Sequence, residues 1–268
     1  MSYPRISVFA SSANGNANAT RIIEGQETLQ ARTSHDISMD SIHDEVAVPN
    51  PFALAILFFR GGAKGNEPPI RVIQGPKTLL NYPDNVTMDG THSEAFVAQI
   101  MTDAVLVFRS DAGGDTAPIR ILRGPKTKID RPVRVSVDSV NNLLAVTSMQ
   151  GILVFNRTDN GDVAPKWIIS GPKTGLGVNR GTRKVVLSPS GKKIIATGRT
   201  LVPQEDQGFG GRSAFIGIWN YGDNGDVAPW AIMPGASAYS TALDPATKEM
   251  ITVDRGELKV YLMPELFQ

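Results

Sequence analysis

Short runs of alternating apolar and polar residues, each ending at a turn, recur along the whole chain. Their β-branched and aromatic content, with Asn, Asp and Gly in the turns, is typical of half-buried strands. No segment keeps a helical period with capping residues. The pattern therefore predicts antiparallel strands and little helix. The clearest set is Val133–Asp138 (VRVSVD), Leu143–Ser148 (LLAVTS), Ile152–Asn156 (ILVFN) and Lys166–Ser170 (KWIIS).

This four-strand unit is repeated. Five segments share a strand, a loop with Gly-Asp or Gly-Asn, a second strand and a closing glycine, as in VFRSDAGGDTAPIRILRGPKT from Val107. A period of about 50 residues suits one supersecondary unit per repeat, and a repeated four-stranded meander is a propeller blade. We expect residues 1–268 to form a single all-β domain, a β-propeller. The closing glycines, Gly25, Gly75, Gly124, Gly171 and Gly235, lie 50, 49, 47 and 64 residues apart.

The two ends of the chain complement one another. Thr20–Glu24 looks like a fourth strand without a first or second, and the C-terminal meander ends on a third strand, Leu258–Met263. We predict five four-stranded antiparallel blades, with Thr20–Glu24 closing the C-terminal meander and removing an open sheet edge. Because Ile6–Ala10 also looks like a third strand, six blades, one of them incomplete, are the alternative.

The blades carry a family resemblance. First strands end in Asp, at Asp40, Asp89 and Asp138, and third strands end in Val-Phe. These features resemble NHL-repeat and related lactonase-like β-propeller proteins. The resemblance covers nearly the whole chain at the level of single blades and is not specific to one activity. It implies the propeller fold, and it raises calcium as a cofactor because lactonase-like propellers hold this ion through Glu, Asn and Asp of inner strands.

The composition limits the kinds of partner that the protein is expected to bind. The chain has net charge +1, an isoelectric point near 7.9 and no cysteine. We therefore expect no nucleic-acid partner, and the chain has no disulfide, cysteine nucleophile or thiolate metal site. It lacks an apolar run of 18 residues, and its start lacks the charged and apolar regions of a signal peptide. We expect a soluble protein without a membrane partner, either cytoplasmic or the mature form of a secreted protein.

Antiparallel pairing sorts the loops to two ends of each blade. The hairpin end has the first-to-second and third-to-fourth turns, which include the Gly-Asp loops. The connection end has the second-to-third turns, the GPKT segments and the blade-to-blade links. The longest insertion, Arg199–Ser213 (RTLVPQEDQGFGGRS), lies at the connection end. Long Gly-rich loops on a regular scaffold often serve recognition.

The predicted binding site lies at the connection end, where first strands begin around a channel mouth. Different side chains occupy the five equivalent positions, whereas purely structural positions tend to repeat. This indicates one asymmetric site for a small molecule, glycan or peptide. Two cations there favour an anionic or carbonyl-bearing ligand. The predicted binding residues are Asp36, Asn85, Arg134 and Lys184, with Arg199 and Arg212 from the insertion; the fifth first strand begins at Ser240.

The sequence does not decide whether the protein is an enzyme. His35 beside Asp36 is the histidine placed for proton transfer, whereas His43 and His92 occupy matching turns. Asp36 and Asn85 match two of the calcium ligands of lactonase-like propellers, but the positive charges of Arg134 and Lys184 disfavour the binding of a divalent cation. We expect no metal and no cofactor. The leading hypothesis is a ligand-binding propeller, and the alternative is a small-molecule enzyme at the same mouth: a lactonase-like hydrolase, or a metal-independent cyclase or lyase.

Overall fold

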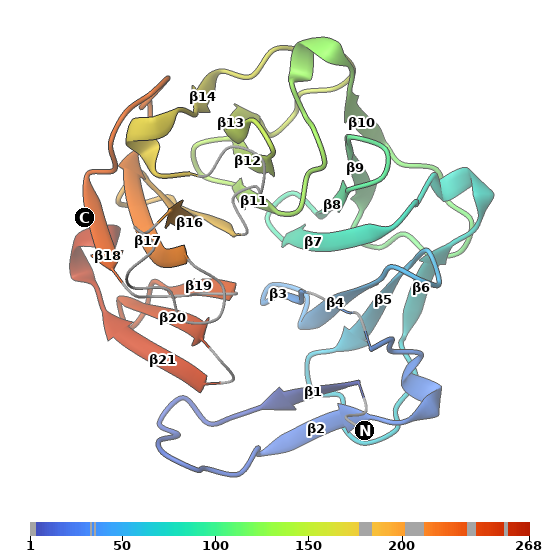
Figure 1. The fold of residues 1–268 in the computed structure, drawn as a ribbon. Coiled ribbons are helices and arrows are strands. Elements are labelled where there is room, and N and C mark those ends of the chain that lie inside the picture. Colours follow the sequence, from blue (N-terminus) through green and yellow to red (C-terminus); the bar gives the residue numbers. More distant parts are fainter. Residues whose placement is uncertain are drawn as a thin grey trace. The chain divides into compact units, whose positions relative to one another are not determined.

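The chain folds as an all-β protein of the five-bladed β-propeller class (Figure 1). The computed structural model describes residues 4–32, 34, 36–176, 184–201, 212–234, 240–254 and 257–268. Within these residues every strand pair is antiparallel, apart from isolated parallel bridges, and the helical elements are 3-10 turns of three or four residues. The predicted strand content and scarcity of helix are therefore confirmed.

The strands form six sheets. Four blades have four strands each, the fifth has three, and the N-terminal residues form a separate hairpin. The hairpin is β1 (Arg5–Val8) and β2 (Arg21–Glu24); blade 1 is β3 (Ser38–Asp40), β4 (Glu45–Asn50), β5 (Ala55–Arg60) and β6 (Arg71–Gln74); blade 2 is β7 (Pro83–Asp89), β8 (Glu94–Gln99), β9 (Ala104–Arg109) and β10 (Arg120–Arg123); blade 3 is β11 (Val135–Asp138), β12 (Leu143–Ser148), β13 (Gly151–Asn156) and β14 (Trp167–Ile169); blade 4 is β15 (Val185–Ser188), β16 (Lys193–Leu201), β17 (Arg212–Asn220) and β18 (Ala231–Pro234); blade 5 is β19 (Ser240–Asp244), β20 (Glu249–Asp254) and β21 (Glu257–Leu262).

Short 3-10 turns follow the outer strands. They hold the repeated GPKT or GQET sequence and end on a left-handed residue. A fifth turn, η6 (Pro264–Phe267), follows β21 and buries Leu266 completely. The repeated turns are η1 (Gln26–Thr28), η2 (Pro76–Thr78), η3 (Pro125–Thr127) and η4 (Pro172–Thr174).

The chain divides into two compact units. Unit 1 comprises residues 1–101 and 106–119, and unit 2 comprises residues 102–105 and 120–268. That residues 1–268 form one domain stays a prediction.

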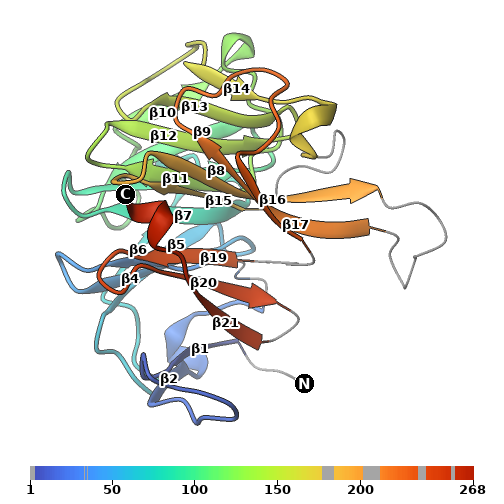
Figure 2. The same ribbon diagram turned by 90° about the vertical axis from the view of Figure 1, so that its left-hand side faces the viewer.

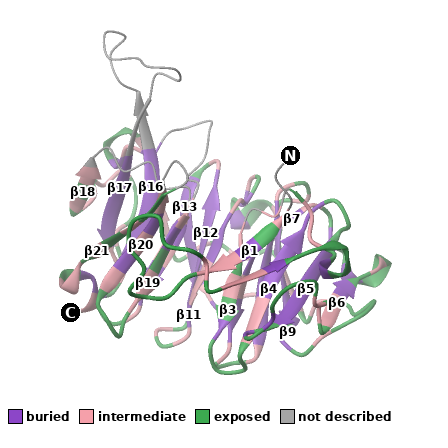
Figure 3. Ribbon diagram, turned by 90° about the horizontal axis from the view of Figure 1, so that it is seen from below, coloured by how far each residue is buried: buried purple, intermediate pink, exposed green. Residues whose placement is uncertain are grey.

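The middle strands of the blades form the cores. In unit 1, β4 and β5 are largely buried, as the purple strands of Figure 3 show. In unit 2, Phe155 and Trp219 are completely buried. Burial of each such aromatic side chain stabilises the fold by roughly 1.5–3 kcal/mol. The alternation in the sequence thus places large side chains such as these two in the interior.

The strand expected to close the C-terminal meander has another partner. Arg21–Glu24 pairs with Arg5–Val8, and Ile6 and Ile23 of this hairpin pack against Val48, Leu57 and Phe59 of blade 1. The pairing predicted for Thr20–Glu24 is therefore corrected, and β21 is the outermost strand of a three-stranded sheet. The strand left over in the sequence analysis explains the difference: it forms β1, which pairs with β2 across the loop of residues 9–20.

The fourth blade departs from the others in strand length. The sequence placed a long turn at residues 199–213, but β16 continues to Leu201 and β17 begins at Arg212. Leu201 pairs with Arg212 in the strand register. Figure 2 shows β16 and β17 side by side, extending beyond β15. The rest of the insertion, residues 202–211, lies outside the described residues.

Candidate functional site

A repeated polar contact joins the third-to-fourth loop of blades 1 to 4 to the 3-10 turn that follows the outer strand of the preceding sheet. In unit 2, Asp162 Oδ1 accepts a hydrogen bond of 2.7 Å from Lys126 N, at the start of η3. Asp226 binds Lys173 N at 2.7 Å in the same way. We call this contact, together with the closing glycine it covers, the blade clasp. Unit 1 has two more clasps, Asn66 with Glu27 N at 2.9 Å and Asp115 with Lys77 N at 2.6 Å.

The clasp explains the closing glycine and the threonine of GPKT. Gly124 has φ +134°, and a Cβ atom there would lie 2.4 Å from Asp162 Cγ, so no other residue fits. Thr127 Oγ1 donates to Gly124 O at 2.6 Å, which tightens the turn. The GPKT lysines contribute their backbone N–H to the clasp, while Lys77, Lys126 and Lys173 are exposed.

The Gly-Asp loops extend further than the hairpin turns that the sequence suggested. Gly161 N donates to Ile121 O at 2.7 Å and Gly161 O accepts from Arg123 N at 3.2 Å, which makes a short parallel bridge to Leu122. Gly161 has φ +75°, a left-handed conformation that glycine adopts without steric cost. The loop thus covers the outer edge of the preceding strand and hides backbone groups that could otherwise pair with another chain.

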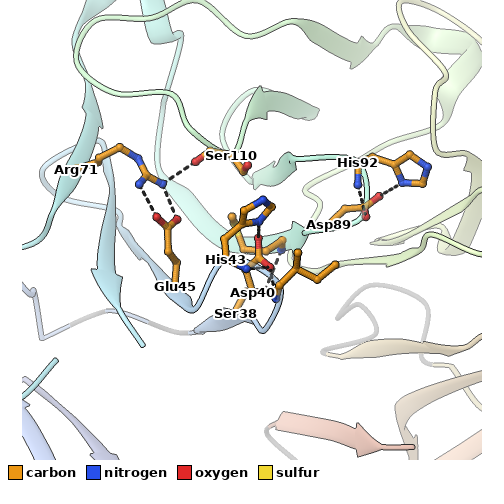
Figure 4. A network of polar contacts seen from close by, with 10 residues as sticks. Ser38, Asp40, His43, Glu45, Arg71, Asp89, His92 and Ser110 are labelled. Carbon is orange, nitrogen blue, oxygen red and sulfur yellow. Dashed lines mark hydrogen bonds and ion pairs between the residues drawn. The ribbon is translucent and has the colours of Figure 1, made fainter. Parts of the chain in front are cut away.

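The histidine turns at the hairpin end repeat as predicted. Asp40 Oδ2 lies 2.8 Å from His43 Nδ1, and Asp89 Oδ2 lies 2.8 Å from His92 Nδ1 (Figure 4). Asp40 also accepts backbone N–H groups through Oδ1. The histidine thus finishes a turn that the aspartate organises.

In blade 3 the corresponding aspartate has other partners. Asp138 Oδ2 accepts from Asn141 Nδ2 and from the hydroxyl of Tyr221, both at 2.7 Å. Burial, followed by the hydrogen bond to Asp138, raises the pKa of Tyr221 far above its usual value of 10.0. Tyr221 therefore stays protonated and donates to the carboxylate.

Buried polar residues at the ends of second strands were missed by the sequence analysis. Ser148 Oγ donates to Asp130 O at 3.2 Å, and Gln99 Nε2 donates to Leu79 O at 3.1 Å. Asn50 Nδ2 binds Leu29 O at 2.8 Å. The available signal was a polar last residue in three largely apolar strands: Asn50 in EVAVPN, Gln99 in EAFVAQ and Ser148 in LLAVTS. Their bonds fix the blade-to-blade links, so their role is structural.

The predicted connection-end residues of unit 1 meet. Asn85 Nδ2 donates to Asp36 Oδ2 at 2.7 Å, so the starts of two neighbouring first strands are in contact. Asn85 is buried and Asp36 is half-buried. A second link of these strands joins Ser38 Oγ to Met88 N at 2.9 Å. His35, the candidate base, lies outside the described residues.

In unit 2, Arg134 and Lys184 precede the neighbouring strands β11 and β15. The strands are linked by Ser136 Oγ and Leu187 N at 3.0 Å, the counterpart of the Ser38 link. Arg134 is only 8% exposed, and its Nη1 donates to Val133 O at 2.8 Å. The sequence placed this residue at an open mouth, so its burial is a finding of the structure.

The remaining predicted residues are placed by their strands alone. Arg199 pairs with Ala214 in the β16–β17 register, and Arg212 pairs with Leu201. Both strands belong to unit 2. The described residues contain no group of three or more His, Asp or Glu side chains that could hold a metal ion. They also contain no helix that is long and apolar enough to cross a membrane.

A pocket of about 260 Å³ lies in unit 1, on the hairpin side. At its wall, Arg71 Nη1 and Nη2 each donate to one oxygen of Glu45 at 2.6 Å, and Nη2 also donates to Ser110 O at 2.7 Å (Figure 4). The hydrogen bond to Glu45 raises the pKa of Arg71. The lining residues are His43, Glu45, Arg71, Ser93, Arg109, Ser110 and Asp111.

Comparisons with known proteins support the fold. No protein-family model matches the chain, and no curated protein matches its sequence. Among solved structures, a candidate 6-phosphogluconolactonase from Bacteroides uniformis superposes with TM-score 0.58 at 17% identity, over 91% of this chain and 69% of that one. The hydrazine synthase of Kuenenia stuttgartiensis gives TM-score 0.57 at 16% identity, over 90% and 69%. At these identities the likeness establishes the propeller fold alone.

Proposed function

We propose that the protein is a ligand-binding β-propeller whose site for an anionic or carbonyl-bearing small molecule lies at the connection end of unit 2. Arg134 and Lys184 immediately precede the neighbouring first strands β11 and β15 there. Cations at adjacent strand starts attract a carboxylate or phosphate, and charge-assisted hydrogen bonds to such groups are strong. Arg199 and Arg212, on the two long strands of blade 4, are further members of the proposed site. The proposal requires no metal and no cofactor.

One observation carries this proposal: the backbone at these positions repeats while the side chain does not. Arg134 N donates to Thr147 Oγ1 at 2.9 Å and Arg134 O accepts from Thr147 N at 2.9 Å. Lys184 makes both bonds with Thr197, each at 3.2 Å. Because these bonds use only backbone atoms of the first-strand residue, they place no demand on its side chain. Different side chains on one repeated backbone favour a role in recognition.

Calorimetric titration tests the site with 6-phosphogluconate, a sugar acid that carries both a carboxylate and a phosphate. Arg134→Gln and Lys184→Gln each remove a charge-assisted bond worth roughly 1.5–3 kcal/mol. We expect each to weaken binding about 10- to 100-fold. The matched control is Lys173→Gln, which removes the same charge from an exposed lysine of unit 2. Unchanged affinity in both site variants, or no binding by 6-phosphogluconate, gluconate and inorganic phosphate, contradicts the proposal.

A lactonase-like hydrolase is the second candidate, favoured by the structural likeness to a candidate 6-phosphogluconolactonase. In this proposal Asp36, oriented by the Asn85 amide, removes a proton from the attacking water, with His35 as the alternative base. Hydrolysis of 6-phosphogluconolactone above its spontaneous rate, lost in Asp36→Asn, would support this activity. The spontaneous rate in the presence of folded protein would exclude this substrate and leave the binding proposal standing.

A further inference from the structure

The hairpin-side pocket of unit 1 presents hydrogen-bonding groups whose charges are already balanced. Arg71 is bound through both terminal nitrogens to Glu45, and its guanidinium lies 4.7 Å from the centre of the Phe58 ring. Arg109 binds Asp111 through Nε at 2.9 Å and Nη2 at 3.2 Å. A ligand with a full charge of either sign would have to break one of these pairs or face a like charge.

His43 gives the pocket an oriented donor or acceptor. Asp40, whose side chain is 1% exposed, holds the Nδ1 atom of His43 at 2.8 Å. The other ring nitrogen, Nε2, is then the atom that can bind a ligand, and the His43 side chain is 42% exposed. In Figure 4 His43 lies beside the Glu45–Arg71 pair and Ser110. The turn that the repeat uses for structure therefore places an imidazole at a pocket.

The ligand chemistry follows from these groups. A hydroxyl group both donates and accepts, so it can use the remaining lone pairs of Glu45 and Asp111 and the remaining donors of Arg109 and His43. The volume of 260 Å³ is below the range of roughly 300–1,000 Å³ for drug-sized ligands. We propose that this pocket binds a small uncharged polyhydroxylated molecule, the size of one sugar ring, as a second site separate from the connection end.

The chain supplies a matched control in blade 2. His92 has the same 2.8 Å contact with a buried aspartate and a similar side-chain exposure of 35%, but it is not among the residues that line this pocket. A variant at His92 therefore reproduces the structural loss of the turn without the loss of a pocket group. Any difference between the two histidine variants reports on the pocket.

Saturation-transfer NMR and shift mapping with D-glucose, D-galactose, D-mannose and L-fucose test the proposal on the full chain. We expect at least one sugar to bind, and His43→Ala to weaken its affinity at least fivefold. His92→Ala should leave the affinity within twofold, although both variants lose similar thermal stability. His43→Gln is the second variant, because its amide keeps the volume and polarity if His43→Ala fails to fold.

Four outcomes overturn the inference or its assignment to an uncharged ligand. One is that none of the four sugars binds at tens of millimolar, and another is that His92→Ala weakens binding as much as His43→Ala. The third is that Lys184→Gln abolishes sugar binding, because the two sites would then not be separate. If 6-phosphogluconate instead of the neutral sugars shifts the His43 resonances, the assignment to an uncharged ligand is wrong. None of these results decides whether an anion binds at Arg134 and Lys184.

Discussion

Two regions of unit 2 differ in what recurs from blade to blade: the side chain in one, and only the backbone hydrogen bonds in the other. At the clasp of Gly124 with Asp162, residue type and hydrogen bond recur from blade to blade. At the strand starts of Arg134 and Lys184, the backbone bonds recur and the side chains differ. The difference teaches that a residue repeats where its side chain makes the contact. A residue is free to specialise where only its backbone does.

The largest effect is expected at the closing glycine. Gly124→Val places a β-branched residue at φ +134° and drives its Cβ into the Asp162 carboxylate. Strain and overpacking each cost about 1–3 kcal/mol, so we expect the free energy of unfolding in urea to fall by roughly 2–6 kcal/mol. The matched control is Gly161→Ala, where φ is +75° but nothing lies within 4 Å of the added Cβ. Equal losses in both variants would show that the clasp contact has no part in the effect.

A smaller effect is expected at the carboxylate of the clasp. Asp162→Ala removes the acceptor of Lys126 N and should destabilise the protein by about 0.5–2 kcal/mol, as the loss of a helix cap does. Asp162→Asn should be nearly neutral, because Asn66 already accepts from Glu27 N in the equivalent clasp. Thermal and urea unfolding measure both variants. If Asn costs as much as Ala, the carboxylate charge is what matters, and the clasp is not a simple hydrogen bond.

Tyr221 shares a feature with each of these two regions. It contacts Asp138, a turn aspartate that recurs between blades, but its own position holds different residues in other blades. Its pKa is raised in the folded protein by burial and by Asp138, so the folded state keeps a proton that the unfolded state loses near pH 10.0. The contribution is therefore fully present below pH 10 and is lost as pH rises above it. We expect Tyr221→Phe to lose about 1 kcal/mol at pH 7 and to show a shallower fall in stability between pH 9 and 11. Parallel pH profiles for the two proteins would contradict the assignment.

The smallest effect is expected at the GPKT lysine. Lys173 supplies its backbone N–H to the clasp and leaves its side chain exposed. Lys173→Gln should change the free energy of unfolding by no more than about 0.5 kcal/mol. Differential scanning calorimetry checks this value. A larger loss would mean that the lysine side chain, and not only its backbone, belongs to the clasp.

Much of the fold was accessible from local sequence. Strands such as β12 and β13 follow the alternation, and the turn aspartates Asp40, Asp89 and Asp138 cap the amides immediately after them. These features depend on contacts a few residues apart. Even the positive φ of Gly161 was predictable from its turn.

The candidate sites were accessible only in part. The contact of Asp36 with Asn85 agrees with the predicted equivalence of strand starts, because the repeat period fixes which residues are neighbours. The burial of Arg134 and the pocket beside His43 were not predicted. The pocket depends on how the loop of one repeat lies on another, and no local pattern encodes that distance.

The sequence by itself determined the repeat, the strands within each blade and the turns that join them, since backbone preferences and side-chain alternation act over a few residues. Only the tertiary structure decided that Asp162 clasps a turn 36 residues earlier, that Glu45 and Arg71 wall a pocket and that β2 pairs with β1. The physical reason is that a carboxylate can satisfy many donors at similar energy. Which donor it meets is set by the packing of whole blades.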